Sequence, residues 1–254
     1  MSKSLYFLFA LSIILMTCYA DNSNKSATCA PSNCGKVSIG YPFWRRSNTM
    51  VGVVCGYPDF GLECSEGHAI ITLPSDTYYV EEINYDQHSI TLVDIDILNQ
   101  ACPRAQHNVS LHNLPLSFSS LDLNLNFYFN CSSYPSSVDP IGCFLKNSHD
   151  TNQSYVFSTG MDYGYDEWLM QCEEHVVVTV LQDEIESGDL ITGFGAAMKK
   201  GFVLDWRRAE DCAECEQSGG YCGFNQTTKQ SRCICRDGRT FAKSCNKGTL
   251  ALAC

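Results

Sequence analysis

Cysteine content is the feature of this sequence that most restricts how the chain can fold. The 254 residues include 16 cysteines, and the densest group falls within residues 212–245. So short a segment cannot bury a hydrophobic core, and cross-links must take its place. In an oxidising compartment this density predicts a disulfide framework. The spacings Cys212-x-x-Cys215 and Cys233-x-Cys235 are also those of zinc ligands, which would be the alternative in a cytosolic protein.

The N-terminus predicts the oxidising compartment. An apolar run over residues 5–16 has the length of a signal-peptide core and is too short to span a bilayer. Small residues, Cys18 and Ala20, follow at the positions that signal peptidase reads. We therefore expect cleavage of residues 1–20 and a mature chain that starts at Asp21; a buried N-terminal helix is the alternative. No second long apolar run follows, so we expect a secreted, extracellular chain without a membrane segment of its own.

Cleavage would remove Cys18 and leave fifteen cysteines, which is an odd number. We expect the terminal Cys254 to be the unpaired one, as a free thiol or an intermolecular partner. No metal site is expected. The cysteines expected in disulfides are Cys29, Cys34, Cys55, Cys64, Cys102, Cys131, Cys143, Cys172, Cys212, Cys215, Cys222, Cys233, Cys235 and Cys245.

Glycosylation signals and net charge agree with export. The Asn-x-Ser/Thr sequons predict a glycoprotein whose modified loops face solvent. The sequons are Asn24, Asn108, Asn130, Asn152 and Asn225. The formal net charge is −11, without a cluster of cations. Nucleic acid and anionic lipid both require such clusters, so neither is expected as a partner.

Residues 29–102 predict an all-β module. Short runs of β-branched or aromatic residues alternate there with Gly, Pro, Asn and Asp. The expected strands cover residues 37–39, 68–73, 77–83 and 89–95. Residues 21–28 are small and polar and predict a flexible arm. Residues 103–120 are rich in Pro, Asn and Ser and predict a connector.

A second β module is predicted over residues 121–211. Residues 121–127 alternate apolar and polar side chains like a half-buried strand, and further strands are expected at 155–157 and 176–181. Residues 187–200 are the best helix candidate, with Ser187 as the cap. The cysteine-rich segment 212–245 follows, then a tail at 246–254. We expect a mainly β, disulfide-rich fold of two small β modules in tandem, with at most one short helix near 187–200.

Several strings in the sequence resemble known plant domains. NCG at 33–35, IGYPFW at 39–44 and CGYPDFGLEC at 55–64 resemble the galacturonan-binding extracellular domain of wall-associated receptor kinases, closest to the leaf-rust-resistance branch. GFVLDW at 201–206, SGGYCG at 218–223 and CICRDG at 233–238 resemble the C-terminal domain associated with those kinases. Together the two resemblances cover nearly all of residues 29–245.

The last six cysteines resemble the second half of an EGF-like domain. The usual EGF pairing would imply the disulfides Cys212–Cys222, Cys215–Cys233 and Cys235–Cys245. If these six pair internally, five cysteines remain in the first module and three in the second. Neither group is even, so at least one disulfide should link the two modules.

No catalytic constellation is recognisable. Full-length members of the family are serine/threonine kinases, but this sequence contains no Gly-rich phosphate loop, catalytic-loop His-Arg-Asp or Asp-Phe-Gly. It also lacks an HExxH and a Gly-x-Ser-x-Gly motif. We therefore expect no catalytic residues and no enzymatic activity. A glycosidase with two opposed carboxylates is the alternative that spacing cannot test in a β fold.

A binding site is expected in one short segment. Tyr41, Phe43 and Trp44 supply aromatic rings on which sugars can stack, and Arg45 and Arg46 follow directly. The guanidinium fork suits a carboxylate because it donates two parallel hydrogen bonds. For Tyr41 and Phe43 a structural role in the core is the alternative.

The resemblance implies an extracellular polysaccharide-binding module. Its ligand would be a cell-wall polysaccharide such as pectin or an oligogalacturonide, and its role wall sensing or defence. If the chain is part of a full receptor, its location would be the plasma membrane. Pectin is a polyanion and this chain is acidic, so calcium that bridges carboxylates is the one cofactor considered. The alternative is a protein-interaction module for a peptide or co-receptor, which an exposed apolar patch would favour.

Overall fold

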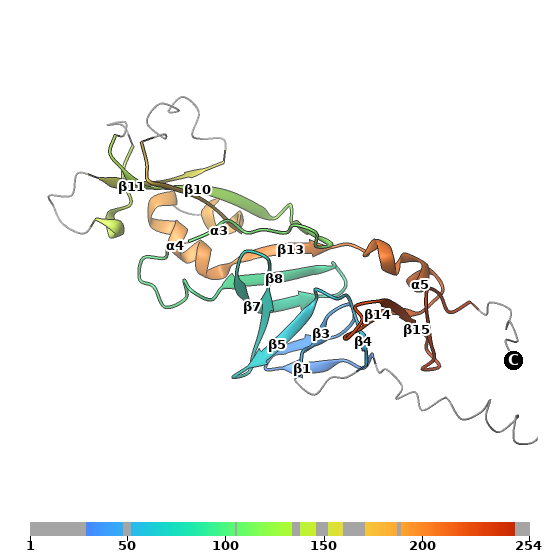
Figure 1. Cartoon of the computed structure of the whole chain (residues 1–254). Coiled ribbons are helices and arrows are strands. Elements are labelled where there is room, and N and C mark those ends of the chain that lie inside the picture. Colours follow the sequence, from blue (N-terminus) through green and yellow to red (C-terminus); the bar gives the residue numbers. More distant parts are fainter. Residues whose placement is uncertain are drawn as a thin grey trace, which may run out of the picture.

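The computed structural model shows several β-sheets accompanied by short helices (Figure 1). It describes residues 29–47, 52–104, 106–133, 138–145, 152–159, 171–186 and 189–246. The expected signal peptide, the arm with Asn24, and residues 247–254 with Cys254 lie outside this part. Among the described residues, no helix is both long and apolar enough to cross a membrane.

A seven-stranded sheet forms the body of the first module, with the order β3-β5-β6-β7-β8-β13-β9. Its strands are β3 (Trp44–Arg45), β5 (Gly61–Ser65), β6 (His68–Thr72), β7 (Thr77–Asn84), β8 (Ser89–Asp94), β9 (Leu116–Phe118) and β13 (Phe202–Trp206). Neighbouring strands are antiparallel except β3 and β5, which run parallel. Side chains alternate between the two faces of a strand, so Tyr78, Val80, Ile90 and Leu92 all face the core.

The hairpin of β1 (Ser32–Cys34) and β2 (Val37–Ile39) packs onto this sheet through Val37 and Ile39. The strands expected at 37–39, 68–73, 77–83 and 89–95 are therefore confirmed as β2, β6, β7 and β8.

The large sheet draws strands from outside the first module. Residues 202–206 fall within the expected second module, where no strand was expected at this position, yet they form β13 and pair antiparallel with β8, with Leu204 opposite Ile90. β9 lies within the expected connector and pairs with the other edge of β13. The expected boundaries at 102 and 121 therefore do not follow the strand pairing. The physical reason is that Phe202 and Leu204 bury their side chains in the core of the first module.

The second module contains a three-stranded antiparallel sheet and the longest helix. The sheet has the order β11-β10-β12, formed by β10 (Asp122–Cys131), β11 (Gln153–Ser158) and β12 (Glu174–Leu181). These strands match those expected at 121–127, 155–157 and 176–181, except that β10 begins one residue later, at Asp122. The turn η1 (Gly142–Phe144) precedes β11, and the helices α3 (Asp183–Glu186) and α4 (Leu190–Lys200) follow β12. Figure 1 shows α4 between this sheet and the β8–β13 part of the large sheet.

The helix expected at 187–200 is confirmed as α4, but its cap differs from the one expected. Ser187 lies outside the described residues, and the Asp189 side chain accepts a hydrogen bond from the Ile191 backbone N–H. The helix ends at Gly201, which has a φ of 84°. A Cβ there would lie 1.9 Å from the Leu92 carbonyl oxygen, so only glycine lets the chain turn this close to β8.

The cysteine-rich segment forms a small sheet with the order β16-β15-β14-β4. Its strands are β14 (Tyr221–Asn225), β15 (Ser231–Ile234), β16 (Thr240–Phe241) and, from the first module, β4 (Val53–Cys55). The turn η2 (Glu210–Cys212) and the short helix α5 (Ala213–Gln217) lead into it. Because β4 pairs with β14, the EGF-like segment is hydrogen-bonded to the first module rather than tethered beside it.

Seven disulfides link the fourteen cysteines that were expected to pair. The EGF-like pairing is confirmed as Cys212–Cys222, Cys215–Cys233 and Cys235–Cys245. Cys29–Cys55 and Cys34–Cys64 lie within the first module, and Cys131–Cys172 within the second. The expected bridge between the two modules is Cys102–Cys143.

Candidate functional site

The five residues of the expected binding segment have different environments. Phe43 is a core residue, 2% exposed, stacked on Phe60 and edge-on to Trp206. Phe43 therefore has a structural role in the core, which was the alternative to a binding role for this residue. Trp206, which begins a second aromatic-plus-arginine string, is also a core residue at 7% exposed.

Tyr41 belongs to a partly buried hydrogen-bond network. The hydroxyl groups of Tyr41 and Tyr57 both donate to Oε1 of Glu216 on α5. Arg208 Nε lies 2.6 Å from the other carboxylate oxygen, Oε2. The Tyr41 oxygen in turn accepts a hydrogen bond from the Cys222 N–H. One carboxylate thus connects the first module, the linker after β13 and the EGF-like segment.

Burial changes the acidity of these tyrosines. Burial raises the pKa of Tyr57 to about 12, and the hydrogen bond to Glu216 adds to the effect. The pKa of Tyr41 is also raised, first by burial and then by the same carboxylate. Both side chains therefore stay neutral hydrogen-bond donors at physiological pH, and the network holds Tyr41 in place rather than presenting it to a ligand.

Trp44 packs against two glycines, Gly56 and Gly61. A Cβ on Gly56 would come within 2.7 Å of its Cδ1 atom, and a Cβ on Gly61 within 2.5 Å of its Cζ2 atom. Its Nε1 donates to the Tyr57 carbonyl oxygen at 2.8 Å. Its ring lies 5.5 Å from the ring of Phe224 on β14. The indole is half-buried, so part of its surface stays accessible in a fixed orientation.

The two arginines project to different sides of the chain. Gly61 lies beneath Arg46 as well as Trp44, because its Cβ would meet Arg46 Nε at 2.7 Å. Trp44 and Arg46 are therefore neighbours on one face, as alternation along a strand requires. Arg45 points away and donates to the Asn33 carbonyl oxygen at 3.3 Å. The Arg46 guanidinium is exposed and makes no ion pair within the described ranges.

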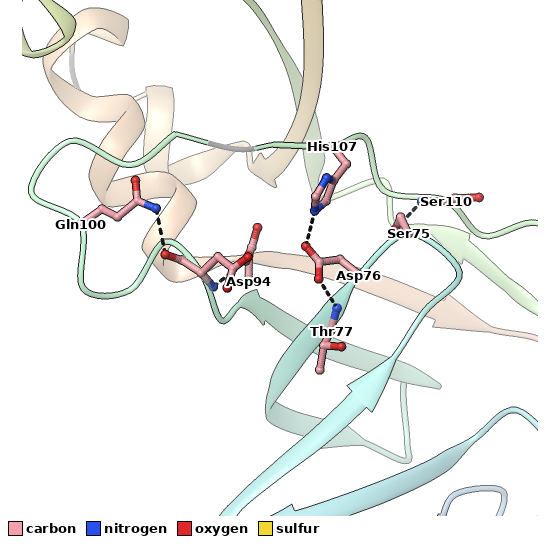
Figure 2. A network of polar contacts seen from close by, with 8 residues as sticks. Ser75, Asp76, Thr77, Asp94, Gln100, His107 and Ser110 are labelled. Atoms are coloured by element: carbon pink, nitrogen blue, oxygen red, sulfur yellow. Dashed lines mark hydrogen bonds and ion pairs between the residues drawn. The ribbon is translucent and has the colours of Figure 1, made fainter.

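A second polar cluster lies where β7 begins and β8 ends (Figure 2). Carboxylate oxygens of Asp76, Asp94 and Asp96 lie within 4.8 Å of one another. His107 Nε2, from the expected connector, lies 2.7 Å from Asp76 Oδ2. Burial raises the pKa of Asp94, and the neighbouring carboxylates add to the rise. Carboxylate oxygens of this kind suit calcium. Some of them already accept hydrogen bonds: the backbone N–H of Thr77 donates to Asp76, and that of Asp96 donates to Asp94.

Sequence reasoning missed several residues that shape the site. Glu216, Gly56, Gly61 and Phe224 were not singled out, although Gly56 and Gly61 belong to the CGYPDFGLEC string. In that string Gly56 precedes Tyr57 and Gly61 follows Phe60, but the ring that packs on both glycines is Trp44, which lies outside the string. Phe224 carried no local signal, because its contact with Trp44 depends on the pairing of β4 with β14.

Two family models match the chain. Residues 29–94 match the galacturonan-binding domain of wall-associated receptor kinases, and residues 139–238 match the wall-associated receptor kinase C-terminal domain. The two matches together span well over half of the chain, which therefore belongs to the ectodomain family of wall-associated receptor kinases. Neither matched domain is a kinase domain, so the matched part corresponds to the ectodomain of these receptors.

Relatives with the same ectodomain occur in Arabidopsis thaliana. The leaf rust 10 disease-resistance locus receptor-like protein kinase-like 1.2 is 29% identical over 253 residues, which cover 96% of this chain and 37% of the relative. The leaf rust 10 disease-resistance locus receptor-like protein kinase-like 2.1 is 29% identical over 250 residues, which cover 91% of this chain and 37% of that relative. The chain thus spans a little over a third of the length of these relatives. No solved structure gives a significant match.

Proposed function

We propose that this ectodomain binds acidic cell-wall polysaccharide, pectin or oligogalacturonide, through the face formed by Trp44 and Arg46. One observation carries the proposal: an accessible indole lies over Gly61 beside a guanidinium that pairs with no carboxylate among the described residues. The ring offers a flat apolar surface for a sugar, and the guanidinium offers a bidentate partner for its carboxylate. The match to a galacturonan-binding domain supports the same ligand class.

The net charge of −11 does not oppose this ligand at the site itself. Screening limits the reach of exposed charges to about 8–10 Å at physiological salt, so the cations nearest the ligand dominate. Several other cations are neutralised locally: Lys36 pairs with Glu81, and Arg104 with Glu174. Arg46 has no such partner in the part of the chain that the structure describes.

The test is calorimetric titration of the mature, glycosylated protein with size-defined oligogalacturonides, at two salt concentrations and with or without calcium. We expect saturable, salt-sensitive binding that Arg46→Gln weakens about tenfold or more, because a charge-assisted bond is lost. Lys200→Gln is the matched control, since it removes an exposed cation at the end of α4. Methyl-esterified oligomers, which lack the carboxylate charge, should not bind. Equal affinity of Arg46→Gln and the unmodified protein would contradict the proposal.

A protein partner is the second candidate, and one observation favours it. Phe118 and Leu121 flank the turn between β9 and β10 and are 42% and 57% exposed. Two large apolar side chains beside one turn are a candidate contact for a peptide or co-receptor. Absence of oligogalacturonide binding under every condition would transfer the proposal to this surface. The wider role, wall sensing or defence by a receptor at the plasma membrane or in the apoplast, is part of the same proposal.

A further inference from the structure

We infer that the polysaccharide site extends onto the EGF-like segment, where Lys229 supplies a second cation beside Phe224, the ring that packs on Trp44. This inference rests on the proposed function. It makes the ligand an acidic oligomer with carboxylates on separate sugar residues, rather than a single uronate.

The EGF-like segment contributes directly to the surface around Trp44. β14 pairs with β4 of the first module, with Phe224 opposite Val54. The same pairing brings the Gly56 N–H to the Cys222 carbonyl oxygen at 2.9 Å. Phe224 is only 2% exposed and its ring lies 5.5 Å from that of Trp44. Phe224 therefore supports the indole from the side, and the hairpin that carries it borders the proposed site.

Lys229 lies at the turn of this hairpin, and the turn is well defined. Asn225 Oδ1 accepts hydrogen bonds from the backbone N–H groups of Thr227 and Thr228, at 2.9 and 3.0 Å. The Lys229 N–H donates to the Asn225 carbonyl oxygen at 2.8 Å. The Lys229 ammonium then lies 5.9 Å from the centre of the Phe224 ring. Both Trp44 and Lys229 thus lie beside the same ring, which keeps the ammonium in the neighbourhood of the indole.

The other cation of the hairpin, Arg232, does not lie near the Phe224 ring. Arg232 lies opposite Gly223 in the β14–β15 ladder, and cross-strand partners project to the same face. Phe224 follows Gly223 and projects to the other face, so Arg232 points away from the Trp44 side. Lys229 is exposed, and the ring contact is the only interaction of its side chain with another described residue.

Arg46 and Trp44 lie together over Gly61, and Trp44 and Lys229 both lie beside the Phe224 ring, so the extended site comprises these four groups. A sugar stacked on Trp44 brings its own carboxylate within reach of one cation, Arg46. A second carboxylate further along the same chain is needed to reach Lys229. Affinity should consequently increase with oligomer length until both cations are engaged, and the longer ligands should show the steeper salt dependence.

The test compares Lys229→Gln with Lys200→Gln in the glycosylated protein, using a disaccharide and progressively longer oligogalacturonides. Lys229→Gln should weaken binding of the long oligomers about three- to tenfold and flatten their salt dependence, while disaccharide binding stays unchanged. Lys200→Gln should bind every length like the unmodified protein. Thermal unfolding of both variants confirms that the fold is intact.

Two results would overturn the inference in distinguishable ways. If Arg46→Gln abolishes binding while Lys229→Gln has no effect at any length, the site ends at Trp44 and the proposed function stands. If no oligogalacturonide binds the unmodified protein, the proposed function and the extension fail together. An equal loss in Lys229→Gln for disaccharide and long oligomers would also contradict the length dependence.

Discussion

The close packing of Trp44 against Gly61 gives a prediction about stability and binding. In Gly61→Ala the new Cβ would lie 2.5 Å from Trp44 Cζ2, 2.8 Å from Cη2 and 2.7 Å from Arg46 Nε. Ordinary carbon contacts are about 3.5–4.0 Å, so the indole must move by about 1 Å. Arg46 can yield because it is the end of a flexible side chain. Trp44 cannot easily do so, because its N–H is bonded to Tyr57 and its ring packs on Phe224.

The cost follows from what holds the indole. Overpacking in a close-packed site costs about 1–3 kcal/mol, and a displaced aromatic pair forfeits about 0.5–1.5 kcal/mol. We expect Gly61→Ala to lower the free energy of unfolding by about 1–3 kcal/mol. It should also weaken oligogalacturonide binding, although residue 61 has no side chain that could contact the ligand.

Denaturant unfolding and titration on the same sample provide the assay. Gly193→Ala is the control, because a Cβ there meets nothing within 4 Å and the position lies inside α4. That change should stabilise the protein by about 0.5–1 kcal/mol, since alanine replaces glycine in a helix. If Gly61→Ala matched the unmodified protein in both stability and affinity, the supporting role of Gly61 and the assigned orientation of Trp44 would be refuted.

Three further predictions concern stability. Burial raises the pKa of Asp122 to about 6. Its charged form is therefore unfavourable in the native state, and the stability of the protein falls as pH increases from about 4 to 6. Asp122→Asn should remove this loss of stability, about 1–2 kcal/mol after allowance for partial exposure, in unfolding measured across that pH range. Gly220→Ala would place a Cβ 2.7–2.9 Å from the sulfurs of Cys215, Cys233 and Cys245. It should lower the stability measured by thermal unfolding more than Gly219→Ala, whose Cβ meets no atom within 4 Å and whose effect comes only from a φ of 79°. The reverse order would contradict the packing around these disulfides. Replacing both Cys102 and Cys143 by alanine should lower stability by about 2–4 kcal/mol and loosen the second module in hydrogen exchange, and unchanged exchange there would contradict a structural role for the bridge.

Local patterns in the sequence predicted the elements whose causes are local. The alternation at 121–127 and the β-branched run at 176–181 gave β10 and β12, because side chains on one face of these strands are buried against α4. The EGF-like pairing followed from resemblance, and the odd counts in the two modules before it predicted a bridge between them, which the structure identifies as Cys102–Cys143.

Features that depend on distant partners were not predictable in this way. β13 reads as an apolar strand in either module, and only the core around Phe202 and Leu204 determines that it pairs with β8. β4 is three residues long, and its position beside β14 depends on the fold of two segments.

At the site, the sequence indicated Trp44 and Arg46 but not their shared face over Gly61. It also placed Tyr41 and Phe43 in the binding segment, whereas burial assigns Phe43 to the core and Glu216 holds Tyr41.

The pairing of β8 with β13 also affects how the protein is made. A chain leaves the ribosome from its N-terminus, and early segments begin to fold before later ones exist. Residues 89–92 of β8 must wait for residues 202–205 before that edge of the sheet is covered. Until then the edge presents unpaired backbone groups of the kind that attract other strands. Biogenesis of the first module therefore depends on synthesis of the second, and the interval between them is the period in which the nascent chain most needs chaperone protection.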